Sequence, residues 1–148
     1  MEDIMHIRDP HGHMTVKTAL ILEDDVYFVP DALNQLNEFM CSIPNDWGQL
    51  YLGGQHQKPA TPCAGYTIGN SVNRTHAYAV SSRYIQSVYR HISYMPDYVG
   101  TNRHVDHQLE TAHARKDWPV YCPPIWFAGQ EAGSSNISGN TNSRQIWI

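Results

Sequence analysis

The spacing of apolar residues along the chain predicts a mixture of strands and helices. Residues 19–22 are four apolar side chains bounded by charge, and they predict a buried strand over 17–22 of the kind found inside a parallel sheet. After Pro30-Asp31, apolar residues recur at helical spacing from Leu33 to Ile43, which predicts a helix. A strand followed by a helix is typical of a layered α/β unit.

The rest of the chain continues this alternation. A short strand is expected at 49–52, ended by Gly53-Gly54, and helices are expected after Ser81-Ser82 and over 105–115. Pro123-Pro124 prevents regular sheet pairing at that point. Further extended segments are expected at 64–68, 76–80, 120–122 and 125–128, and loops at 55–62 and 129–142.

The pattern predicts one folded domain. Residues 1–14 lack periodicity and predict a leader, or a loop that folds over a site. Residues 15–140 predict a single α/β domain without internal repeats, and residues 141–148 predict a tail. A chain of 148 residues is long enough to bury one core.

Three carboxylates, Glu23, Asp24 and Asp25, follow the first apolar run. Open α/β sheets bind their ligands at the carboxyl ends of strands, so this negative charge lies at a potential ligand edge. Because side chains alternate along an extended backbone, Glu23 and Asp25 face one way and Asp24 the other. The pair predicts a shared Mg²⁺ or Mn²⁺, which prefer oxygen ligands. An acidic turn or a charge cluster at a helix N-terminus explains the same residues without a cation.

A second polar cluster, His104, Asp106 and His107, lies at the start of the helix expected over 105–115. A carboxylate beside imidazoles can act as a general base, because its neighbours tune its pKa. Glu110 is one turn from Asp106, and His113 is two turns away. The alternatives are a His/Asp metal site, and a polar helix start in which Asp106 stabilises the helix dipole.

The composition narrows the classes of function. A net charge of −4 and a pI near 6.1, without a Lys/Arg cluster, argue against a nucleic-acid-binding protein. No apolar stretch approaches the roughly 20 residues of a membrane span, and the first residues do not resemble a signal-peptide core. Cys41, Cys63 and Cys122 are widely spaced and odd in number, which predicts reduced core thiols and a cytoplasmic location.

Four segments share an order that is typical of one enzyme family. They are residues 19–26 with the acidic triplet, 47–53 ending in glycine, 75–81, and 105–109 followed by 120–124. In this order they resemble glycosyltransferase family 25, the lipooligosaccharide and collagen galactosyltransferase group, which has the GT-A fold. The resemblance covers about residues 18–138, most of the chain.

The resemblance implies a GT-A-like mixed sheet flanked by helices, and the transfer of a sugar from a UDP-sugar to a glycan or another hydroxyl acceptor. Galactose is one candidate sugar. The implied metal ligands for Mn²⁺ or Mg²⁺ are Glu23 and Asp25. Asp106 would deprotonate the acceptor, with Glu110 or His107 as the alternative base. The residues implied to contact the nucleotide sugar are Asp24, Gly53, Gln130, Ser135 and Asn136.

Two other classes of function fit the same residues. One is a catalytically inactive or partner-dependent module that binds a sugar or a nucleotide. The other is a metal-dependent phosphohydrolase or nuclease that uses Glu23, Asp25 and His104 or His107.

The resemblance also predicts an assembly. In the family a nucleotide-binding βα half precedes the acidic motif, whereas about 22 residues precede it in this sequence. We therefore expect the domain to lack much of that half and the strand over 18–22 to leave unpaired backbone groups at an apolar edge. Such an edge favours association. This predicts a homo-oligomer, by default a two-fold dimer, or a partner chain that covers residues 19–22.

Overall fold

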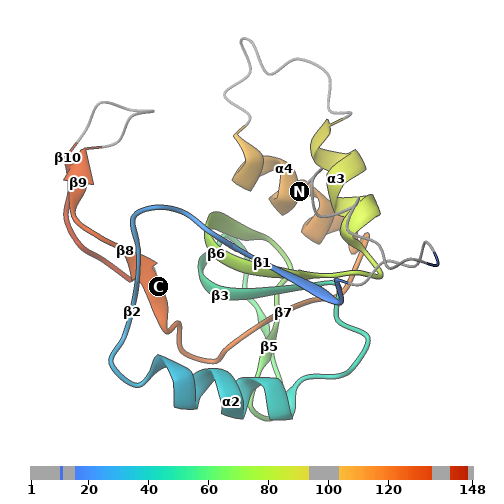
Figure 1. Cartoon of the computed structure of the whole chain (residues 1–148), viewed down its shortest axis with the longest axis horizontal. Coiled ribbons are helices and arrows are strands. Elements are labelled where there is room, and N and C mark those ends of the chain that lie inside the picture. The colour runs from blue at the N-terminus through green and yellow to red at the C-terminus, as the bar shows by residue number, and fades with distance from the viewer. Residues whose placement is uncertain (1–10, 12–15, 94–103, 135–140, 147–148) are drawn as a thin grey trace.

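The protein is built in three layers, with a mixed sheet between helices on both faces (Figure 1). The computed structural model describes residues 11, 16–93, 104–134 and 141–146. In this part of the chain a six-stranded sheet has the order β1-β6-β3-β7-β5-β4. Strands β3 and β7 are parallel, and the other neighbours are antiparallel. The strands are β1 (Thr18–Leu22), β3 (Gln49–His56), β4 (Thr61–Pro62), β5 (Thr67–Ile68), β6 (Val72–Ser81) and β7 (Val120–Cys122).

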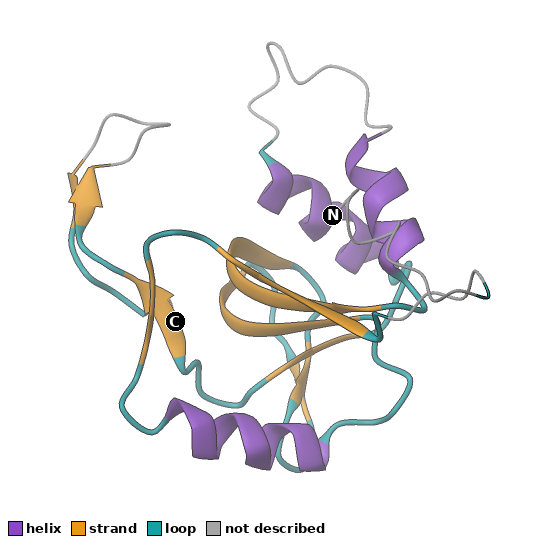
Figure 2. Cartoon of the chain, viewed as in Figure 1, coloured by secondary structure: helices purple, strands orange, loops and turns teal. Residues whose placement is uncertain are grey.

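Three helices and two short ladders complete the described structure (Figure 2). Strand β2 pairs with β8 and β9 pairs with β10, both antiparallel. The helices are α2 (Ala32–Ser42), α3 (Ile85–Ser93) and α4 (Val105–Arg115). The short strands are β2 (Val26–Phe28), β8 (Ala128–Gln130), β9 (Gly133–Ser134) and β10 (Thr141–Asn142).

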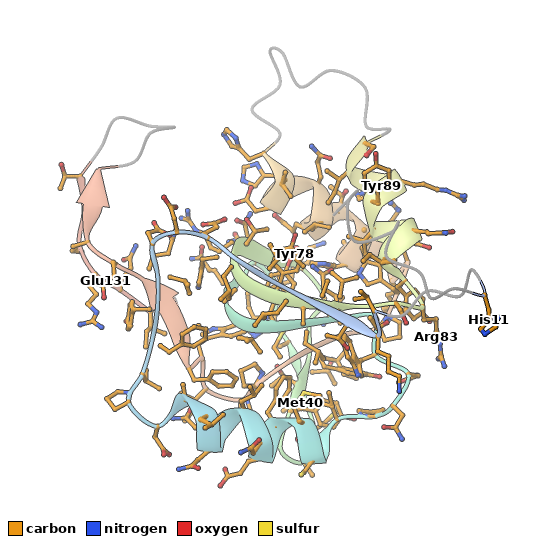
Figure 3. All side chains as sticks on the ribbon, viewed as in Figure 1. His11, Met40, Tyr78, Arg83, Tyr89 and Glu131 are labelled. Carbon is orange, nitrogen blue, oxygen red and sulfur yellow. The ribbon has the colours of Figure 1, made fainter. Side chains whose placement is uncertain are left out.

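Alternating side chains of the central strands build a core on each face of the sheet. Tyr51, Tyr78 and Val80 pack toward α3 and α4, and Figure 3 shows Tyr78 on that side. Their neighbours Leu50 and Ala79 pack with Phe39 of α2 on the opposite face. This alternation is what the period of two in a strand requires when both faces are covered by helices.

The α/β class predicted from the sequence is confirmed, and two elements have the predicted bounds: the helix over 105–115 and the strand over 120–122. The stripe expected on α3 is also present, since Ile85 and Val88 are buried. The segment expected as a tail contributes β10, and Gln145 forms a bridge with Gln130.

The interpretation of the first strand as buried inside a parallel sheet is wrong. Strand β1 lies at an edge of the sheet and pairs antiparallel with β6, and of its side chains only Ala19 is buried. The sequence did not distinguish the two cases, because an edge strand with exposed leucines has the same run of apolar residues as a central strand. Leu20 is 53% exposed and Leu22 is 44% exposed.

The second strand is longer than predicted, because β3 continues through Gly53-Gly54 to His56. A Cβ atom at Gly53 would lie 2.2 Å from the Ala128 carbonyl oxygen and 2.4 Å from His76 Nε2. Glycine inside a strand often marks such a close approach rather than the end of the strand.

Candidate functional site

The acidic triplet lies in a turn between β1 and β2. The Glu23 N–H donates to the His76 carbonyl oxygen at 2.9 Å, which ends the pairing of β1 with β6. The Val26 N–H then donates to the Glu23 carbonyl oxygen at 3.3 Å and closes the turn. The triplet is therefore not extended, as the alternation argument assumed, and Asp24 and Asp25 are exposed at the turn.

Glu23 and Asp25 nevertheless share one partner, Gln130. Its Nε2 lies 3.3 Å from Glu23 Oε2 and 3.4 Å from Asp25 Oδ2, so the amide group bridges the two carboxylates. The pairing of β2 with β8 explains this position, because Val26 lies opposite Gln130. The Glu131 N–H also donates to the Asp25 carbonyl oxygen at 2.7 Å, and Figure 3 shows Glu131 on the segment that leads to β9.

The Glu23 carboxylate lies in a strongly negative environment. Burial raises the pKa of Glu23, the Thr75 hydroxyl opposes this by donating to Oε1 at 2.7 Å, and the charges of Asp25, Asp106 and Asp24 raise the pKa further. Since Asp106 acts on Glu23, the helix start and the strand end belong to one electrostatic unit. We call Glu23, Asp24, Asp25 and Asp106 the acidic corner.

An irregularity in β6 brings Thr75 to Glu23. Gly53 pairs with Ala77 and Gln55 pairs with Asn73, so a step of two residues in β3 faces a step of four in β6. Within this bulge Arg74 has a φ of 71°, a left-handed conformation that is uncommon for residues other than glycine. Bulges frequently occur next to active sites, where they redirect a side chain.

The first turn of α4 supplies the fourth carboxylate. Asp106 is half-buried, and its Oδ1 accepts the His107 backbone N–H at 2.9 Å. Its negative charge near the helix N-terminus is stabilised by the helix dipole. His107 and His104 are exposed, with ring centroids 5.9 Å apart.

Glu110 connects α4 to the sheet through hydrogen bonds of its carboxylate. Its Oε1 accepts the Ser71 hydroxyl at 2.7 Å, and its Oε2 accepts the Asn73 amide at 3.0 Å. Ser71 is 1% exposed and Asn73 is 6% exposed, so these donors depend on the carboxylate. The geometry gives Glu110 a structural role, and its alternative role as a base stays a prediction.

His113 belongs to a buried polar cluster rather than to the acidic corner. Its Nε2 lies 3.0 Å from Gln49 Oε1, which also accepts the Trp118 indole N–H at 3.0 Å, and Gln49 Nε2 donates to the Tyr51 hydroxyl at 3.3 Å. Burial lowers the pKa of His113 to about 3. We call Gln49, Tyr51, His113 and Trp118 the Gln49 network. His113 lies two turns beyond Asp106 on α4, as expected, and its hydrogen bond with Gln49 places it in this buried network.

The remaining expectations from the sequence concern Gly53, two residues of the segment 135–140, and the cysteines. Gly53 has a packing reason to be glycine, and its contact with a nucleotide stays a prediction. Ser135 and Asn136 lie outside the described residues. Of the three cysteines, all free, Cys122 is buried as predicted, whereas the prediction of a core thiol is wrong for Cys41, which is exposed.

Sequence reasoning did not assign Thr75 or His76 to the site. His76 is fully buried against Gly53, and burial lowers its pKa, while the Ala128 backbone and then the Asp25 charge partly oppose that change. The signal was two polar residues inside an apolar strand, next to one another. Their position beside Glu23 and Gly53 depends on the β6 bulge, which no pattern in the sequence predicts.

Two apolar hollows lie on the other face of the protein, beside α2. One of about 410 Å³ lies between the helix and the segment 123–127, and one of about 280 Å³ lies against Leu33 and Phe28. Phe127 lines both hollows, and neither is lined by a residue of the acidic corner. The chemistry of the corner is therefore independent of them.

Among the described residues, no three or more His, Cys, Asp or Glu side chains form a group suited to hold a metal ion by themselves. No helix in the described part of the chain is long and apolar enough to cross a membrane. No protein-family model matches the chain, and a search of curated proteins finds no match. The resemblance to glycosyltransferase family 25 therefore stays a prediction that rests on the residues themselves.

Proposed function

We propose that this protein is a metal-dependent glycosyltransferase that transfers a sugar from a UDP-sugar to a hydroxyl acceptor. The observation that supports this most directly is the acidic corner. Two carboxylates bridged by Gln130 lie at the end of β1, and Asp106 lies within electrostatic reach of Glu23. The order of the four family-like segments supports the same function.

The donor set fits Mg²⁺ or Mn²⁺ completed by substrate. Such cations are usually held by one or two carboxylates together with substrate phosphates and water, rather than by a full protein cage. Glu23 and Asp25, which share Gln130 as a partner, would supply that number of ligands. When bound, the cation would stabilise the developing charge on the diphosphate leaving group.

The protein's own residues then have distinct roles. Glu23 and Asp25 would bind the divalent cation. Gln130 and Thr75 orient these two carboxylates by hydrogen bonds. Asp106 accepts the proton of the acceptor hydroxyl as that oxygen attacks the anomeric carbon. Asp106 is half-buried at the start of α4, and its Oδ1 accepts the His107 backbone N–H.

Ligand-induced stabilisation tests the binding part of the proposal. A ligand that binds only the native state stabilises it by about 2.7 kcal/mol at 100 times Kd, which for a chain of this size raises Tm by roughly 5–10 °C. Mn²⁺ with UDP should produce such a shift, and Glu23→Ala/Asp25→Ala should abolish it. The matched control, Asp31→Ala/Glu38→Ala, removes the same charge from exposed positions at α2 and should keep the shift. An unchanged response in the Glu23/Asp25 variant removes these residues from the site.

Turnover of UDP-sugars tests the chemistry and separates the alternatives. Sugar transfer supports the proposal, binding without turnover indicates an inactive module, and diphosphate cleavage that ignores the sugar indicates a phosphohydrolase. Asp106→Asn should lower turnover by about 10²–10⁴-fold while the Mn²⁺-UDP shift persists. If Asp106→Asn weakens nucleotide binding and leaves the turnover of the bound complex unchanged, Asp106 is a ligand rather than a base.

A further inference from the structure

The outer edge of β1 offers backbone groups that no described strand pairs with. The Ser82 N–H donates to the Lys17 carbonyl oxygen, and the Glu23 N–H donates to the His76 carbonyl oxygen, so Lys17 and Glu23 direct their backbone groups toward β6. In an antiparallel ladder this direction alternates residue by residue. Thr18, Leu20 and Leu22 therefore direct their N–H and C=O groups outward.

The side chains at this edge are apolar. Leu20 and Leu22 lie opposite Ala79 and Ala77, on the α2 face of the sheet, and both leucines are exposed. Native edge strands are usually protected by charge, proline or a bulge. Residues 18–22 contain no charged residue and no proline, and they pair with β6 without a bulge.

The charges at the two ends of β1 are complementary. Exposed Lys17 precedes the strand, and Glu23 and Asp24 follow it. If β1 meets an antiparallel copy of itself with Leu20 opposite Leu20, Thr18 lies opposite Leu22 and Lys17 lies opposite Glu23. In this register all three outward-facing residues of each strand meet outward-facing residues of the other, as hydrogen-bonded pairs.

We propose that β1 pairs with β1 of a second copy of this chain, around a two-fold axis through Leu20. The interface joins the two sheets into one, and a two-fold contact of this type closes on itself. It also brings Lys17 of each copy to the acidic corner of the other, so that each corner gains a cation from its neighbour. The interface stands whether or not the corner binds a nucleotide sugar.

Light scattering after size exclusion, at tens of micromolar, tests the interface. The unmodified chain should be a dimer. Leu20→Pro removes an outward N–H and leaves the ladder with β6 intact, because proline is tolerated on an edge strand whose N–H faces outward. This variant should be a monomer with an unchanged circular dichroism spectrum. Leu20→Lys gives a second route if the proline variant does not fold, and Leu33→Lys, at a leucine that is 71% exposed on α2, should leave the dimer intact.

Cross-linking tests the register. In a background of Cys41→Ser/Cys63→Ser, Leu20→Cys should form an intermolecular disulfide, since hydrogen-bonded pairs have Cα atoms about 5.5 Å apart, within the range that a disulfide spans. Thr18→Cys should not link to itself, because the two positions are offset by four residues, roughly 13 Å. A mixture of Thr18→Cys and Leu22→Cys chains should link.

The charge contribution has its own control. Lys17→Glu places like charges opposite each other and should weaken the dimer by about tenfold, whereas Lys58→Glu, at another exposed lysine, should not. A monomeric unmodified chain at tens of micromolar overturns the proposal. So does a Leu20→Pro or Leu20→Lys variant that remains a dimer. Equal cross-linking of Thr18→Cys and Leu20→Cys overturns the register.

Discussion

Helix α4 contributes side chains to two polar regions, the Gln49 network and the acidic corner. The two regions differ in whether their polar groups are neutral and hydrogen-bonded or negatively charged. In the Gln49 network every side chain has a neutral hydrogen-bond partner, and His113 is held neutral by burial. In the acidic corner, burial and the charges of Asp25, Asp106 and Asp24 raise the pKa of Glu23. The first region contributes stability, whereas the second holds negative charge that a ligand could neutralise, a pattern that is typical of functional sites.

The largest expected effect is the loss of the acceptor at the centre of the Gln49 network. Gln49→Leu leaves the His113 and Trp118 N–H groups buried without their acceptor. Each buried unpaired group costs about 1–3 kcal/mol, so the free energy of unfolding should fall by roughly 2–5 kcal/mol. Urea unfolding measures this, with Gln57→Leu, an exposed glutamine, as the control. A loss below about 0.5 kcal/mol would contradict the role given to the network.

The two carboxylates of α4, Glu110 and Asp106, should differ in how much they contribute to the free energy of unfolding. Glu110→Ala removes the acceptor of two buried donors and should cost about 1.5–3 kcal/mol of unfolding free energy. Asp106→Asn should cost much less, because the Asn side-chain oxygen can still accept the His107 N–H. Unfolding curves of both variants, measured side by side, give the answer. The reverse order would assign the structural role to Asp106.

Acid should weaken the Gln49 network. The pKa of His113 is about 3, below its ordinary value of 6.5. Its contribution to stability is therefore complete above pH 6.5 and is lost as the pH falls from 6.5 toward 3, by up to about 1.4 kcal/mol per pH unit. His113→Gln should show a shallower dependence over this range. Parallel curves for the two proteins would mean that His113 does not titrate as described.

The smallest effect on stability is expected in the acidic corner. Its dependence on pH is opposite to that of His113, because stability should fall as the pH rises. The pKa of Glu23 is raised from 4.5, so its charged form is disfavoured in the folded protein and the destabilisation appears as the pH rises through that raised pKa. Glu23→Gln should match the parent protein below pH 4.5 and become the more stable of the two above it. A Glu23→Gln variant that is less stable at pH 7 would show that the charge is already compensated.

Local patterns predicted the elements of this fold better than their partners. The apolar spacing of Val105, Leu109 and Ala112 located α4, and Pro123-Pro124 located the break after β7. The apolar spacing did not give the position of β1 at an edge, because four consecutive apolar residues carry no information about which sides are covered. The expectation of an edge at residues 18–22 came from the family resemblance instead, and β1 does lie at an edge of the sheet. Strand order depends on contacts between distant residues, which periodicity does not encode.

The candidate site was predictable only in part, for the same reason. The carboxylates of Glu23 and Asp25 were visible as a motif, and Gln130 entered through the family resemblance. The partners of Glu110 and His113 were not visible, since Ser71 and Gln49 lie far from them in sequence and meet them only across the sheet. A histidine or a carboxylate on a helix looks the same in sequence whether it is a buried structural group or a reactive one.

The separation in sequence of the groups that hold Glu23 has a consequence for how the protein folds. Thr75 is 52 residues away, and Gln130 is 107 residues away. Closing such long loops is entropically slow compared with forming a helix such as α2. During synthesis the acidic triplet leaves the ribosome long before Gln130 exists, so its carboxylates remain hydrated until the sheet has formed. A nascent chain that stops before β8 lacks Gln130 and therefore the amide that bridges the Glu23 and Asp25 carboxylates.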